Sequence, residues 1–199
     1  VAAFDVVGFS AIVEADEDNA LAAWRALRRH IEPLISRSGG RVFKSLGDGL
    51  LVEFTSPVDA THSALEVQAA AAVMAPTRDI RLELRCAIHM GEVIVEGTDL
   101  LGDGINVVSR LQDHAPPGGV LVSATVMDLI SGRIEAPIED YGTLALRNIS
   151  RPVHAYVVGA GKRPKSTPAI DSFQRRRPSV AVVPFVDQTG AKGKTYFCD

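Results

Sequence analysis

Cysteines and long apolar runs are scarce in this chain, and each scarcity excludes a class of protein. The 199 residues include two cysteines, Cys86 and Cys198, which lie too far apart in the sequence for a zinc cluster. No apolar stretch is long enough to cross a bilayer, and the N-terminal residues lack a signal-peptide pattern. The composition is that of a globular protein, for which a reducing cytoplasm is the expected location.

Basic residues are also scarce over most of the chain. Residues 1–160 contain 13 Lys+Arg and 21 Asp+Glu, a formal charge of -8, which argues against nucleic acid as a partner. Positive charge gathers instead in residues 161–178, whose Pro-, Ser- and Thr-rich composition predicts a flexible linker. Residues 179–199 return to strand character. We therefore expect a main domain over 1–160, a basic linker, and the truncated start of a second domain.

Apolar periodicity predicts alternating strands and helices in the main domain. Helices are expected over residues 18–38, 56–75, 105–111 and 124–130. Strands are expected in the first apolar run, at 41–44 and 49–54, twice within 80–96, at 120–123 and at 153–158, with a loop at 99–104. This order favours an α+β fold in which helices pack against one mixed sheet.

Two aspartates stand at the ends of apolar, strand-like runs. Asp5 follows Ala2–Phe4, and Asp48 lies in a Gly-Asp-Gly turn between the runs at 41–44 and 49–54. Burying a carboxylate is costly, and a hard divalent cation is one of the few partners that offsets the cost. If the two strands are neighbours, the carboxylates can share a pair of metal ions that holds a triphosphate, which is a phosphoryl-transfer site.

Four further polar residues extend this hypothesis. Lys44 lies four residues before Asp48, and Asp99 opens the expected loop. Asn106 and Arg110 have i, i+4 spacing, so both lie on one face of the helix expected there. The planar guanidinium of arginine, charged at any physiological pH, is suited to phosphate oxygens.

Three motifs in this order make the sequence similar to a known family. Asp5–Ser10, Lys44–Gly49 and Asp99–Leu111 resemble the class III nucleotidyl cyclase catalytic domain, which comprises adenylate and guanylate cyclases. The similarity covers residues 1–158, including the late segment Leu146–Val153. The resemblance implies a ferredoxin-like, palm-type mixed sheet with helices packed on it.

The resemblance also implies roles for most of the polar residues. Asp5, Asp48 and the carbonyl of Val6 would bind two Mg²⁺ or Mn²⁺ ions per site. Lys44 and Asp99 would read the purine, because lysine donates to N1 of adenine and aspartate accepts from its amino group. A guanylate cyclase would typically carry glutamate at the lysine position.

Asn106 and Arg110 would orient the ribose and stabilise the reacting phosphate. The implied enzyme is an adenylate cyclase that converts ATP to 3',5'-cyclic AMP and pyrophosphate for intracellular signalling. The ribose 3'-hydroxyl would attack the α-phosphate at sites shared across a homodimer interface.

Three further assignments concern phosphate binding and the end of the chain. The backbone N–H groups of Val7, Gly8, Phe9 and Ser10, at the start of a helix, are expected to bind phosphate. Arg147, with Arg151 as the second choice, is the candidate for the terminal phosphates. Residues 179–199 resemble the opening of the TolB-like region that follows the cyclase domain in some bacterial proteins.

Two alternatives stay open at this stage. A degenerate cyclase-homology module would bind nucleotide or a partner without turnover, although such modules usually lose a metal-binding aspartate or the arginine. A guanylate cyclase is disfavoured by Lys44. A P-loop ATPase is disfavoured because the sequence has no Walker-type Gly-x-x-x-x-Gly-Lys motif.

Overall fold

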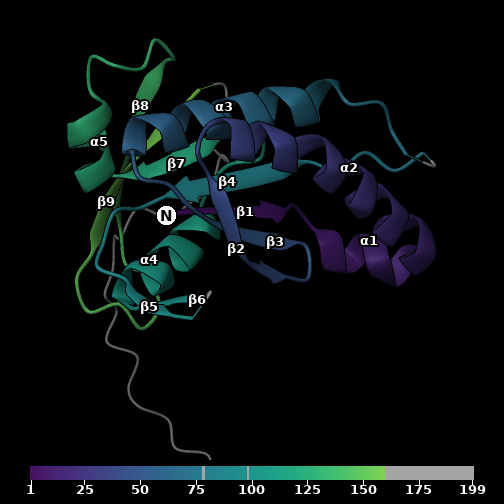
Figure 1. Cartoon of the computed structure of the whole chain (residues 1–199), viewed down its shortest axis with the longest axis horizontal. Coiled ribbons are helices and arrows are strands. Elements are labelled where there is room, and N and C mark those ends of the chain that lie inside the picture. Colours follow the sequence, from purple (N-terminus) through teal and green to yellow (C-terminus); the bar gives the residue numbers. More distant parts are fainter. Residues whose placement is uncertain (78, 98, 160–199) are drawn as a thin grey trace, which may run out of the picture.

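The computed structural model describes residues 1–77, 79–97 and 99–159. The linker expected over 161–178 and the second domain expected over 179–199 therefore lie outside the described residues. The main domain consists of one large sheet, a small two-stranded sheet and five helices within the described ranges (Figure 1).

The large sheet has the strand order β2-β3-β1-β4-β7-β9-β8. Its strands are β1 (Ala2–Val6), β2 (Arg41–Leu46), β3 (Gly49–Glu53), β4 (Leu84–Ile88), β7 (Val120–Ser123), β8 (Ile138–Leu144) and β9 (Val153–Val158). Neighbouring strands are antiparallel except β4 and β7, which are parallel. The strands β5 (Ile94–Glu96) and β6 (Asp99–Leu101) form a separate antiparallel hairpin.

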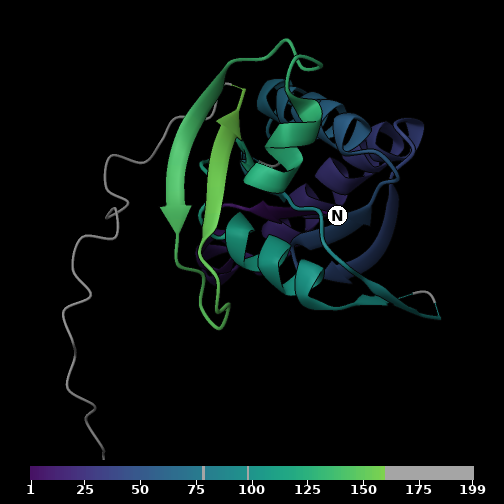
Figure 2. The ribbon, with the colours of Figure 1, turned by 90° about the vertical axis from the view of Figure 1, so that its left-hand side faces the viewer.

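The short helix α1 (Phe9–Ala15) follows the first strand. The four helices that cover the two faces of the large sheet are α2 (Glu17–Arg37), α3 (Pro57–Val73), α4 (Asp103–Gln112) and α5 (Ala124–Ile130). The helices α2, α3 and α5 share one hydrophobic core, and α4 packs alone in a second core on the opposite face (Figure 2). The first four strands with α2 and α3 follow the β-α-β-β-α-β order of a ferredoxin-like fold.

The alternation of side chains along β1 decides which face Asp5 occupies. Phe4 and Val6 belong to the core beneath α2 and α3, whereas Ala3 belongs to the core beneath α4. Because successive side chains of a strand point to opposite faces, Asp5 lies on the α4 face with Ala3. The helix α4 therefore covers the same side of the sheet as the first of the two aspartates.

Most of the predicted elements are present. The differences are the helix α1, which lies outside the four expected helical ranges, and two short or polar strands. The loop expected at 99–104 is wrong, because residues 99–101 form β6 and α4 already begins at Asp103. A three-residue strand is too short to show alternation. The strand β8 was not predicted because it lies at the sheet edge and buries only Tyr141 and Leu144.

Candidate active site

The structure brings Asp5 and Asp48 together. The strand β1 pairs antiparallel with β3, with Phe4 opposite Leu50, so the end of β1 reaches the turn that precedes β3. Burial, followed by the negative charge of Asp5, raises the pKa of Asp48 above its usual range. A Cβ atom added to Gly49 would lie 3.8 Å from Oδ1 of Asp5, which places the Asp5 carboxylate against this turn.

The donor set of this carboxylate pair fits magnesium that is bound together with a phosphate ligand. Within the described ranges, no cluster of three or more His, Cys, Asp or Glu side chains could hold a metal ion by itself. Magnesium, however, is usually held through one or two carboxylates, with substrate phosphates and waters completing its shell. Two carboxylates of like charge at one place also repel each other, and a bound cation would offset that repulsion.

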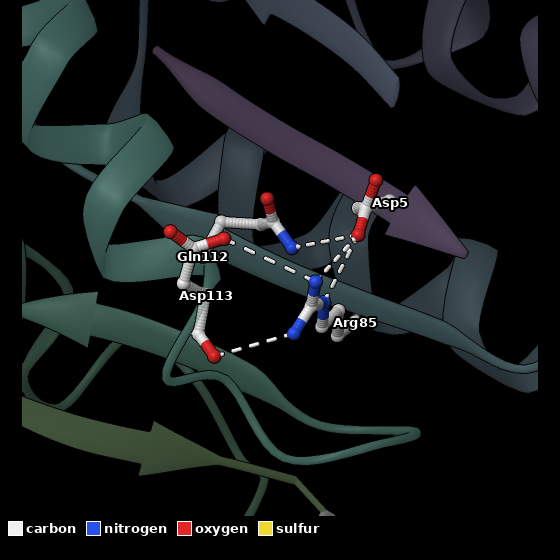
Figure 3. A network of polar contacts seen from close by, with 4 residues as sticks. All are labelled: Asp5, Arg85, Gln112 and Asp113. Carbon is white, nitrogen blue, oxygen red and sulfur yellow. Dashed lines mark hydrogen bonds and ion pairs between the residues drawn. The ribbon is translucent and has the colours of Figure 1, made fainter. Parts of the chain in front are cut away.

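Arg85 is a member of this site that the sequence reasoning missed. It lies directly across from Asp5 in the β1–β4 pairing, and its Nε and Nη2 atoms donate to Asp5 Oδ2 at 3.0 and 2.8 Å (Figure 3). Gln112, at the end of α4, donates to the same oxygen at 3.2 Å. A second arm of the guanidinium donates to the backbone carbonyl of Asp113 at 3.2 Å. The arginine thus connects the end of α4 to the first aspartate.

A sequence signal for Arg85 does exist. It is the one charged residue in the run Leu84–Ile88, whose other four members are buried. A charged side chain inside such a strand needs a partner of opposite charge. The identity of that partner depends on the pairing of two strands whose residues lie 80 positions apart. The sequence pattern therefore indicates that Arg85 needs an acidic partner, but it does not identify Asp5 as that partner.

The two candidate purine-reading residues lie on neighbouring elements. Lys44 is half-buried on β2, the edge strand of the large sheet, where a bulge shifts the pairing with β3 between Val42 and Lys44. The short strand β6, which starts at Asp99, contacts β2. Their roles stay predictions.

Asn106 and Arg110 lie on α4 away from its packed face. Val107, Val108 and Leu111 of the same helix are buried, whereas Asn106 is exposed and Arg110 is half-buried. None of the hydrogen bonds found among the described residues joins either side chain to the two aspartates.

The segment after Asp5 has the backbone geometry of a helix start. Gly8 adopts a left-handed conformation with φ of 68°, α1 begins at Phe9, and no side chain caps the helix. The first N–H groups of a helix have no acceptor within it, so those near Phe9 and Ser10 suit an anionic ligand. The N–H group of Val7 is not among them, because it donates to the carbonyl of Glu83 at 2.9 Å.

The arginines expected to bind the terminal phosphates lie elsewhere. Arg147 and Arg151 are exposed in the connection between β8 and β9. Arg151 lines an open hollow of about 810 Å³, together with Asp103 and Val107 of α4. Among the described arginines, Arg85 is the one that ion-pairs with either aspartate of the carboxylate pair.

Comparison with known proteins identifies the family. The family described as "Adenylate and Guanylate cyclase catalytic domain" matches residues 1–159. The chain belongs to this family. Its sequence is 32% identical to that of an Adenylate/Guanylate Cyclase/Hydrolase from Silicibacter pomeroyi, whose crystal structure is known. The two structures match with a TM-score of 0.72, covering 80% of this chain and 95% of that one. The class III cyclase fold and the mixed sheet predicted from the sequence are thus confirmed.

Other relatives agree with this assignment. A Rhizobium meliloti (strain 1021) protein named "Putative adenylate cyclase 3" is 36% identical over 211 residues, covering all of this chain and 35% of that protein. The adenylyl cyclase CyaB from P. aeruginosa, 21% identical, covers 81% of this chain and 93% of its own with a TM-score of 0.64, which shows a shared fold. The cyclase chain thus spans about a third of the Rhizobium protein. Among the helices of the described residues, none has both the length and the hydropathy required to span a bilayer.

Proposed function

We propose that this cyclase domain is an adenylate cyclase, which converts ATP to 3',5'-cyclic AMP and pyrophosphate. The observation that carries the proposal is the meeting of Asp5 and Asp48 at the end of β1. The relative named "Putative adenylate cyclase 3" supports the choice of nucleotide. A cytoplasmic location, where ATP is available, goes with this proposal.

The carboxylate pair is the proposed metal centre. Asp5, Asp48 and the carbonyl of Val6 would hold two Mg²⁺ or Mn²⁺ ions, which supply a lowered pKa for the ribose 3'-hydroxyl and charge for the triphosphate. Val6 is the last residue of β1, and its backbone N–H group already contacts the Asp48 carboxylate. The first N–H groups of α1, near Phe9 and Ser10, would bind phosphate oxygens.

Arg85 has a second role in this proposal. Its guanidinium balances Asp5 in the metal-free protein. With cations bound at Asp5, the same donors would be available to phosphate oxygens held beside that carboxylate, because a guanidinium can bind two oxygens at once. We therefore favour Arg85 over Arg147 and Arg151 as the residue that grips the departing pyrophosphate.

The proposed preference for ATP depends on Lys44 and Asp99. An ammonium group donates to the N1 acceptor of adenine, and a carboxylate accepts from the adenine amino group. Guanine presents the reverse pattern of donor and acceptor at these two positions, so Lys44 and Asp99 would not form these hydrogen bonds with it. A hydrogen-bonding site is selective because the wrong ligand leaves polar groups of the site unpaired.

The proposed assembly is a homodimer with two shared sites. Asn106 and Arg110 face away from their own sheet, and no hydrogen bond in the described ranges links them to their own chain's aspartates. The β5–β6 hairpin also exposes apolar side chains, with Ile94 and Val95 each 68% and Leu101 42% exposed. Contiguous exposed apolar residues mark interaction surfaces. In a dimer, Arg110 of one chain would offset charge at the α-phosphate held by the other.

Purified protein incubated with ATP and Mn²⁺ tests this function directly. Cyclic AMP and pyrophosphate should appear in equal amounts, and the rate per chain should rise with protein concentration as dimers form. GTP supplied in place of ATP should give a much lower rate. If the dimer is demonstrated and neither nucleotide yields a cyclic product, the catalytic proposal fails.

A further inference from the structure

Trp24 connects the second helix to the turn that carries Asp48. It is the single tryptophan of the chain, it lies on α2, and it is 4% exposed. Its indole Nε1 donates to the backbone carbonyl of Gly47 at 3.1 Å. A buried indole N–H group needs an acceptor, and here the acceptor belongs to the residue directly before Asp48.

The same side chain also contacts the segment that follows Asp5. The rings of Trp24 and Phe9 lie with their centroids 6.4 Å apart and tilted by 59°, and Phe9 is the first residue of α1. One buried ring thus contacts both chain segments on which the carboxylates and the proposed phosphate-binding N–H groups depend.

Arg28, one turn further along α2, strengthens the connection. Its guanidinium lies 5.9 Å from the centroid of the Trp24 ring, and its Nη1 atom donates to Ser45 Oγ on β2 at 3.3 Å. Its Nε atom donates to Glu32 at 2.8 Å, which fixes the guanidinium on the helix surface. The strand leading into the turn and the turn itself are therefore both attached to α2.

The turn needs such attachment for two physical reasons. Gly47 and Gly49 flank Asp48, and glycine loses more conformational freedom on ordering than any other residue. Asp48 also repels Asp5, so a mobile turn would move the two carboxylates apart. We propose that Trp24 is a positioning residue, whose indole N–H group holds the Gly47–Gly49 turn where its carboxylate can share metal ions with Asp5. This inference rests on the proposed function of that carboxylate pair.

The substitution Trp24→Phe tests the proposal, although the smaller side chain fills less of the buried space. Phenylalanine keeps an aromatic ring against Phe9 and Arg28 and removes the N–H group. Amide hydrogen exchange of residues 47–49, measured without metal, should become faster in the variant. Mn²⁺ binding, measured by electron paramagnetic resonance, should weaken by about two- to tenfold, as expected for the loss of one net hydrogen bond.

A matched control separates positioning from general stability. Gln68 of α3 is also buried and donates from its side-chain amide to a glycine carbonyl, that of Gly119, at 2.9 Å. Gln68→Met removes a bond of the same kind that involves neither aspartate. Both variants should lower Tm, and only Trp24→Phe should change exchange at the turn and Mn²⁺ affinity.

The outcomes distinguish this proposal from the proposed function. Unchanged exchange at residues 47–49 in Trp24→Phe would overturn the positioning role, whether or not the protein is an active cyclase. Equal losses of Mn²⁺ affinity in Trp24→Phe and Gln68→Met would overturn it as well. If exchange at the turn is faster in Trp24→Phe but the native protein binds no Mn²⁺, then Trp24 does hold the turn and the proposed metal function is wrong.

The native protein offers a further readout. Because Trp24 is the chain's one tryptophan, its fluorescence reports on the turn without labelling. Paramagnetic Mn²⁺ bound at the carboxylate pair should quench this emission in the native protein and not in Asp48→Asn. Equal quenching in both proteins would show that Trp24 does not lie beside the site where Mn²⁺ binds.

Discussion

At the scale of single residues, an ion pair and a hydrogen bond offset the negative charge of Asp5. The Arg85 guanidinium and the Gln112 amide both donate to one oxygen of the Asp5 carboxylate (Figure 3). The Asp5 and Arg85 side chains are 20% and 27% exposed, so water screens the pair only in part. Removing one partner leaves a poorly solvated charge behind.

Arg85→Ala should therefore act on stability and on substrate binding together. We expect the metal-free protein to lose about 2 kcal/mol of unfolding free energy, as for a charged hydrogen bond, and Mn²⁺ to restore part of it. The KM for ATP should rise because the triphosphate loses a donor. Denaturant unfolding with and without Mn²⁺ measures the first effect, and initial rates measure the second. Arg37→Ala, which removes an exposed pair with Glu66, should leave both quantities nearly unchanged.

His89 is the residue through which acid should destabilise the fold. Burial lowers the pKa of His89 to about 4, and its Nδ1 atom lies 2.9 Å from Ser123 Oγ. In the unfolded chain this pKa returns to about 6.5. Between these values the unfolded chain binds the additional proton, so stability is present above pH 6.5 and decreases as the pH falls toward 4.

The substitution His89→Gln should flatten this part of the stability curve. We expect Tm, followed by circular dichroism, to fall less between pH 6.5 and pH 4 in the variant than in the native protein, whatever its value at pH 7. His30→Gln, at an exposed position of α2, is the control and should keep the native slope. Parallel curves for the native protein and His89→Gln would contradict the assignment.

At the scale of elements, the edge strand β2 and the hairpin strand β6 together would decide which purine is accepted. Lys44→Glu exchanges a donor for an acceptor while Asp99 is kept. The ratio of kcat/KM for ATP to that for GTP should fall by at least about tenfold, because the variant can no longer donate to adenine N1. Charge reversal at Arg25, which is exposed on α2, should leave the ratio unchanged. An unaltered ratio in Lys44→Glu would remove this residue from purine recognition.

Individual elements differ in how far their sequences define them. The strand at Val120–Ser123 and the helix at Ala124–Ile130 have the predicted bounds, because a continuous apolar run and a clear periodicity mark them. The strand β8 is polar along most of its length and pairs only with β9. Its position depends on that pairing, which leaves little trace in the hydrophobicity of the strand.

At the scale of the whole molecule, the shared-site proposal predicts complementation. Asp48→Ala and Arg110→Ala should each reduce kcat by at least about a hundredfold as homodimers. Mixed in equal amounts, they should recover about a quarter of native activity, since half of the dimers then contain one intact site of two. Cyclic AMP formation by the two variants and their mixture measures this. Heterodimers that form without any recovery would contradict the shared site.

The sequence by itself determined the family, the main elements and the candidate site residues. The family follows from the resemblance of three motifs, while apolar runs, a glycine-flanked turn and helical spacing single out Asp5, Asp48 and Arg110 locally. Only the tertiary structure decided which side chains meet. It paired Asp5 with Arg85 across 80 residues and joined Trp24 to Gly47 across 23. Such contacts depend on strand register and on the packing of α2 against the sheet, which arise from burial summed over the whole core.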